Sequence, residues 1–154
     1  MNKTSISIII ILLLIIAGGA YKFIVQGNTA ESSDGRTSIL LNPAERDLVL
    51  AEMRAFLMSI QQINSAIAED NMKLVAESAR KVGKAAQGEV PASLVAKLPL
   101  PFKKLGFDTH TRFDQLAMDT DDLGDANYAL AQLAVLMQNC VACHETYRID
   151  LKMP

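Results

Sequence analysis

The first pattern in the chain is a long apolar run from Ile6 to Tyr21. As a helix that run spans roughly 24 Å, less than the roughly 30 Å of a bilayer core. It reaches a spanning length when the stem of Lys22 snorkels and the apolar residues up to Val25 are included. Small residues ending at Ala20 offer, equally, a cleavage site for a signal peptidase. The sequence therefore predicts that residues 1–25 are an uncleaved membrane anchor or a cleaved signal peptide, and that the remainder is exported.

After a segment rich in Gly, Ser, Asn and Asp, the pattern changes to helical spacing. Residues 26–41 have the composition of a flexible tether. Asn42, Pro43 and Glu45 then form a helix start with a capping box. The first helix is expected to end near Glu69, and apolar residues recur along one face at steps of three and four: Val49, Met53, Phe56, Ile60, Ile63 and Ile67.

Three further amphipathic segments complete the soluble part, residues 42–154. Asp70 is the expected cap of the second helix, whose small apolar stripe consists of Met72, Val75, Ala79, Val82 and Ala86. A third helix is predicted from Asp108 to about Thr120, followed by an acidic turn at Asp121–Asp125. The last helix has the stripe Ala126, Leu130, Leu133, Met137, Cys140, His144 and Tyr147. These segments predict an all-α domain.

Composition and charge exclude several classes of protein. The chain has 154 residues, half of them apolar, which suits one domain of ordinary size. Two of the 15 lysines and arginines precede residue 23, so 13 remain against 17 acidic residues, a net charge of −4. An anionic domain of this kind is not a general nucleic-acid binder. Two cysteines are too few for a disulfide-dense scaffold.

Those two cysteines belong to the motif Cys140-Val141-Ala142-Cys143-His144, the attachment signature of a c-type haem. On a helix, the i, i+3 spacing places both thiols on one side, where they can add to two vinyl groups, with the histidine beside them as an iron ligand. A redox dithiol, a strained disulfide and half of a zinc site are the alternatives. Zinc would need two further ligands, and His110 is the other histidine of the chain.

The motif and the helix layout resemble the cytochrome c′ family and its low-spin, methionine-ligated relatives. Residues 140–148, CVACHETYR, are similar to the Cys-x-x-Cys-His-x-x-Tyr-Arg ending of that family. The resemblance implies an antiparallel up-down four-helix bundle with one covalently attached haem c. It also implies that Cys140 and Cys143 are the thioether anchors, that His144 is the proximal ligand and that Arg148 lies near the proximal face.

The sixth coordination position separates two functions, and several residues compete for it. Met53 lies on the apolar stripe of the first helix, whereas Met58 lies about 140° round that helix. Met58 nevertheless follows Arg54 by four residues, a spacing similar to the family pattern. His110 is a third candidate, and an open position is a fourth. Arg46 is a candidate partner for a haem propionate or a solvated surface residue.

The sequence thus predicts a monohaem electron carrier rather than an enzyme. It would act in the periplasm or at the outer face of the cytoplasmic membrane, with redox proteins as partners, and a homodimer is left open. Ligation by a methionine keeps iron low-spin and favours electron transfer. The alternative, with a non-ligating residue on the distal side, is a high-spin protein that binds or senses nitric oxide.

Overall fold

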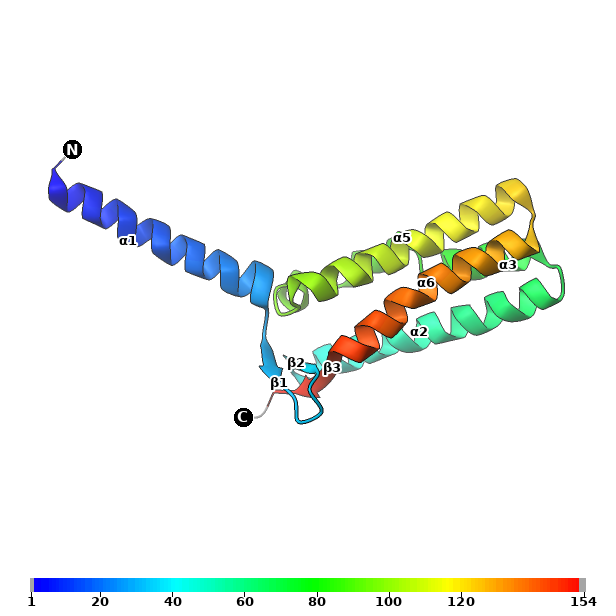
Figure 1. Cartoon of the computed structure of the whole chain (residues 1–154), viewed down its shortest axis with the longest axis horizontal. Helices are drawn as coiled ribbons and strands as arrows, with labels where there is room; N and C mark the ends of the chain where they lie inside the picture. The colour runs from blue at the N-terminus through cyan, green and yellow to red at the C-terminus, as the bar shows by residue number, and fades with distance from the viewer. Residues whose placement is uncertain (1, 153–154) are drawn as a thin grey trace.

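The computed structural model describes residues 2–152, and this part of the chain is mostly helical (Figure 1). Helix α1, Lys3–Ala20, continues directly into the π-helix η1, Tyr21–Gln26. The helical segment Thr4–Gln26 is long and apolar enough to cross a membrane, a property that signal sequences share. The predicted N-terminal hydrophobic helix is therefore present, and it extends away from the other helices.

The start of α2, Pro43–Ala68, confirms the predicted capping box. The Asn42 side chain accepts a hydrogen bond from the Glu45 amide at 2.9 Å, and the Glu45 carboxylate accepts one from the Asn42 amide at 3.1 Å. The next cap was predicted wrongly, because Asp70 has a positive φ of 53° and belongs to the link between helices. Asn71 caps α3, Met72–Arg80, by accepting from the Leu74 amide at 3.1 Å.

The third predicted helix is longer than expected. After the 3-10 helix η2, Lys84–Glu89, and the short α4, Ala92–Val95, helix α5 extends over Leu100–Leu123. Pro101 is tolerated because the first turn of a helix has free amide positions where its missing N–H costs nothing. The helix ends at Gly124, whose φ is +61°, so the expected acidic turn shrinks to Gly124 and Asp125.

The last helix, α6, spans Ala126–Thr146, and Asp125 caps it by accepting from the Tyr128 amide at 3.0 Å. Its predicted stripe is partly wrong: Leu133 is buried, but Leu130 and Met137 are 46% and 40% exposed. Ala129 and Leu136 are buried instead. Compared with the predicted orientation, α6 is rotated about its own axis. In this orientation its polar residues Gln132 and Asn139 bond to Asp119 and Asp108 of α5.

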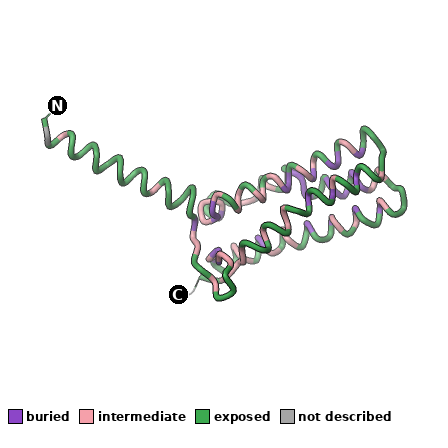
Figure 2. Tube along the Cα trace, viewed as in Figure 1, coloured by how far each residue is buried: buried purple, intermediate pink, exposed green. Residues whose placement is uncertain are grey.

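Helices α2, α3, α5 and α6 pack in that order around one apolar core. Figure 2 shows the buried residues on the inward sides of these helices. The rings of Phe56 and Phe113 stack at 5.5 Å in this core. The fold is mainly helical, as predicted.

A small sheet at one end of the helices was not predicted. Strands β1, Thr29–Glu31, and β2, Thr37–Leu41, are antiparallel, and β2 pairs in parallel with β3, Tyr147–Leu151. Tyr147 is thus paired with Thr37 and does not continue α6. The expectation of a flexible tether over residues 26–41 is corrected here. Because Ile39 and Leu41 are fully buried in a second apolar cluster, this segment is part of the folded domain.

Candidate functional site

The cysteine motif occupies the last turns of α6. Cys140 and Cys143 are half-buried free thiols, whereas His144 is exposed. Burial raises the pKa of both thiols, and the neighbouring Cys140 adds to the effect at Cys143, whose pKa reaches about 11. Both groups are therefore protonated near neutral pH. Such thiols lack the activation that a thiol–disulfide oxidoreductase requires.

The donor set fits a covalently attached haem better than a bare metal ion. Two thiols lie one turn apart on the inward side of a helix, and an imidazole follows the second of them directly. No group of three or more His, Cys, Asp or Glu within residues 2–152 could hold a metal ion. A structural zinc site needs four ligands, so the zinc alternative finds no support around Cys140 and Cys143.

Exposed apolar side chains precede the motif on α6 and are also found on its neighbour α2. Gln132 and Asn139 of α6 bond to α5, whereas Leu130, Met137 and Val141 recur at steps of seven and four residues and so share another face of the helix. These side chains are exposed: Leu130 by 46%, Met137 by 40% and Val141 by 55%. On α2, which contacts α6, Leu57 is 67% exposed. Exposed apolar side chains on two neighbouring helices suit a flat apolar group that packs between them.

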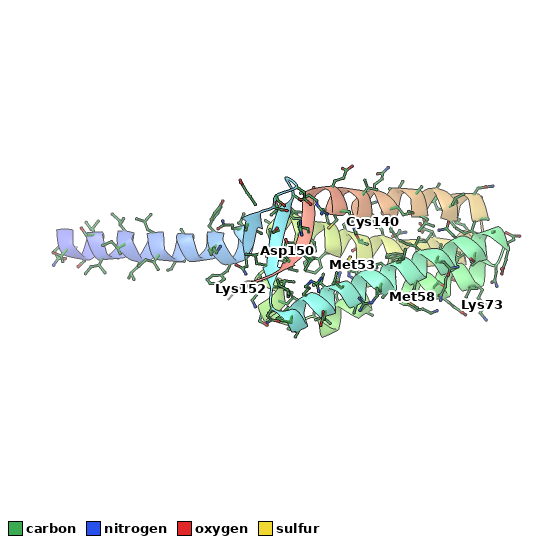
Figure 3. All side chains as sticks on the ribbon, turned by 90° about the horizontal axis from the view of Figure 1, so that it is seen from below. Met53, Met58, Lys73, Cys140, Asp150 and Lys152 are labelled. Atoms are coloured by element: carbon green, nitrogen blue, oxygen red, sulfur yellow. The ribbon has the colours of Figure 1, made fainter. Side chains whose placement is uncertain are left out.

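The two methionine candidates occupy different sides of α2. Met53 is half-buried and packs against the core, at the same level along the molecule as Cys140 of α6 (Figure 3). Met58 is 62% exposed on the outer surface, as the helix geometry predicts. Of the two, Met53 lies toward the inside of the molecule and Met58 does not. Arg46, the candidate partner of a haem propionate, also belongs to α2. Its Nη1 lies 4.0 Å from the Oδ1 of Asp47, and its side chain is partly exposed.

His110 is not at the start of its helix, as the sequence predicted, but in the middle of α5. Its Nδ1 lies 2.8 Å from the Val82 carbonyl, its Nε2 lies 3.1 Å from the Glu52 carboxylate, and the residue is 3% exposed. Burial alone would lower the pKa of His110, but the hydrogen bonds to Glu52 and Val82 outweigh it and raise the pKa. With both ring nitrogens engaged, this histidine has none to offer a metal.

Arg148 lies on β3, and its guanidinium is engaged on the sheet. It pairs with Asp150 at 2.9 Å and with Asp34 at 3.4 Å, and it donates to the Ser32 hydroxyl at 3.2 Å. The hydrogen bond from the Ser38 hydroxyl, together with Arg148, holds the pKa of Asp150 below its usual range. Arg148 thus joins β3 to the loop between β1 and β2.

Arg36 is a residue of this site that the sequence did not reveal. Its guanidinium donates to the carbonyls of His144 and Tyr147, at 3.3 and 3.4 Å. Asp34 holds it in place at 2.7 Å, and that contact lowers the pKa of Asp34 strongly. A cation at the end of α6 also complements the helix dipole. The only available signal was the run of Thr37–Leu41, whose strand character implies an ordered loop before it.

No family model, no curated protein and no solved structure matches this chain.

Proposed function

We propose that this chain is a monohaem c-type cytochrome that carries single electrons. The observation that carries the proposal is the pair of protonated, inward-facing thiols of Cys140 and Cys143, with the free imidazole of His144 beside them. Cys140 and Cys143 would hold haem c through thioether bonds, and His144 would bind its iron. The haem supplies one-electron redox chemistry when bound. The chain supplies a fixed orientation, apolar cover from α2 and α6, and a docking surface for redox proteins.

The packing of α2, α3, α5 and α6 supports the finer proposal of an antiparallel four-helix bundle. Consecutive members of this set are neighbours, and α6 returns beside α2. The short α3, Met72–Arg80, departs from a regular bundle, because η2 and α4 replace its second half.

Met53 is the proposed sixth ligand. It lies on the inward side of α2 at the level of Cys140, whereas Met58 is exposed on the other side. With a methionine thioether and a histidine imidazole as ligands the iron would be low-spin, so little would reorganise on electron transfer. Because Met53 packs against the core, a second function is also supported, that of a protein that binds or senses nitric oxide. If the Met53 sulfur only fills space in the core, the iron would lack a sixth ligand and could bind nitric oxide.

Absorption spectra of the purified full chain, expressed with a haem-attachment system, test both proposals. We expect a low-spin spectrum with little response to carbon monoxide, and loss of covalent haem in the Cys140→Ser, Cys143→Ser double variant. Met53→Ala should convert the spectrum to high-spin, whereas the matched Met58→Ala should leave it low-spin. A wild-type high-spin spectrum would favour the gas-binding protein, and a chain that takes up no haem would overturn the central proposal.

The location is proposed from the N-terminal helix. Thr4–Gln26 can anchor the domain at the outer face of the cytoplasmic membrane, or act as a signal that releases it into the periplasm. Intact mass of the mature protein separates the two. The mass of the full-length chain, together with resistance to alkaline extraction from membranes, would establish an anchor. The mass of a chain that begins at Tyr21, after cleavage behind Ala20, would establish a cleaved signal.

A further inference from the structure

A cavity of about 440 Å³ lies between α2, η2, α4 and the first half of α5. Its lining includes none of the four residues proposed to hold the haem, Met53, Cys140, Cys143 and His144. Glu52 and His110 form part of its wall, already bonded to each other at 3.1 Å. A volume of this size is typical of sites for small organic molecules.

Within the described part of the chain, one buried polar side-chain atom of the wall has no hydrogen-bond partner. Gln87 belongs to the lining, and its side-chain nitrogen Nε2 is shielded from solvent with no hydrogen-bond partner in the described part of the chain. A buried N–H donor left unpaired is costly, and an acceptor on a bound molecule would remove that cost. The cavity therefore favours a ligand that offers an oxygen acceptor to Gln87.

The charged side chains of the wall favour an anion. Lys84 and Lys103 both line the cavity, and His110 has a raised pKa that favours its cationic form. Glu52 balances one of these charges. Lys103 donates to the neutral carbonyl oxygen of Ile24 at 2.8 Å, so its charge is not cancelled there. The net charge of the wall is therefore positive, and a positive wall attracts a carboxylate.

The rest of the wall is apolar, and one position in it carries no side chain. Phe102 and Phe107 contribute aromatic surface, together with several aliphatic residues. Gly106 lies between them inside α5, where glycine is unfavourable for a helix. A Cβ placed there would meet no atom within 4 Å, so the missing side chain leaves space that belongs to the cavity.

We infer that this cavity binds a small organic carboxylate with an apolar body, such as an arylalkyl acid. The carboxylate accepts from Gln87 and lies near Lys84 and Lys103, and the apolar body packs against Phe102 and Phe107. This binding site goes beyond the proposed electron carriage and does not depend on it, because none of its residues takes part in haem attachment.

The test is isothermal titration calorimetry of 4-phenylbutyrate into the full chain in lipid nanodiscs, with empty nanodiscs as the blank. A ligand of this size in a partly polar cavity is expected to bind with Kd on the order of 0.1–1 mM. The uncharged 4-phenylbutanamide has the same apolar body, and we expect it to bind at least fivefold more weakly.

Two variants locate the binding. Gly106→Leu fills the cavity while it improves helix propensity, so binding should fall at least tenfold with no loss of thermal stability. Ala55→Leu adds the same side chain on an exposed face of α2 and should bind like wild type. Gln87→Leu removes the unpaired donor, so binding should weaken about fivefold while the free protein keeps its stability. No binding by wild type, or undiminished binding by Gly106→Leu, would overturn the site, and equal affinity for the acid and the amide would overturn the assignment to carboxylates.

Discussion

The imidazole of His110 connects three elements through two hydrogen bonds. Glu52 of α2 bonds to its Nε2, and the Val82 carbonyl after α3 bonds to its Nδ1. Because these partners raise the pKa of His110 in the folded state, the charged imidazole stabilises the fold. That contribution is complete below the ordinary histidine pKa of the unfolded chain, and it is lost as pH rises through the raised pKa.

We expect the wild-type free energy of unfolding to fall as pH rises through this window. Glu52→Gln should lower stability by about 1–2 kcal/mol at low pH and flatten the dependence, since it removes the carboxylate that favours the cation. Urea unfolding between about pH 5.5 and 8.5 checks this. Glu77→Gln, on the exposed surface of α3, is the control and should keep the wild-type slope. A slope unchanged in Glu52→Gln would contradict the assignment to His110.

Single residues also show what the sequence could predict of the candidate site. The spacing of Cys140, Cys143 and His144 is local, so a helical register suffices to place both thiols on one face. His110 and Arg36 have partners more than 25 positions away along the chain, and no local pattern announces those contacts. Arg148 shows the same limit, because its placement depends on β3 pairing with a strand from the other end of the domain.

Secondary-structure elements were predicted where their boundaries are encoded by neighbouring side chains. The start of α2 is an example, since Asn42 and Glu45 cap each other within one turn. The start of α5 was missed because prolines and Gly106 suggest a break, although Pro101 in the first turn is compatible with a helix. The sheet was missed because Thr37–Leu41 is short and pairs with a strand that lies far away in the sequence.

The sheet gives a prediction at the scale of one strand. Ile39 of β2 is fully buried, between α2 and the segment that contains Leu94 and Leu98. Ile39→Ala should therefore lower the free energy of unfolding by about 2–4 kcal/mol. Leu151→Ala on β3 is the matched control, because Leu151 is 49% exposed, and it should cost less than about 1 kcal/mol.

Urea unfolding of the two variants measures the difference. If residues 26–41 were a flexible tether outside the domain, both substitutions would leave stability almost unchanged. A small effect of Ile39→Ala would thus contradict the place of β2 in the fold.

At the scale of the whole molecule, the N-terminal helix is joined to the domain through fixed contacts. The Asn28 amide donates to the Lys97 carbonyl at 2.7 Å, and its side chain donates to the Leu40 carbonyl at 2.7 Å. Lys103 bonds to the Ile24 carbonyl at the base of that helix. The sheet and the motif end of α6 lie at this same end of the molecule (Figure 1). If the helix stays in the membrane, the proposed haem site faces the membrane surface.

Gly27 lies at the joint between the N-terminal helix and the domain. Substituting it gives a prediction for the whole molecule. Gly27 has a φ of +66°, and a Cβ there would overlap the Lys97 carbonyl and lie 2.7 Å from the backbone carbon of Leu98. Gly35 has a similar φ of +82°, but a Cβ there would meet no atom within 4 Å. Gly27→Ala combines backbone strain with a steric clash, whereas Gly35→Ala has the strain alone.

We therefore expect Gly27→Ala to lower stability by about 2–4 kcal/mol and Gly35→Ala by about 1 kcal/mol. Limited trypsin digestion of the chain in membranes should follow the same order. Arg36 is held by Asp34 and by two carbonyls of the α6 end, so wild type should resist cleavage there. When the joint is displaced in Gly27→Ala, Arg36 should become accessible, and cleavage after it would separate the membrane helix from the domain. Equal cleavage of the two variants would mean that the helix is attached without a fixed joint, and the domain would then be free to turn at the membrane.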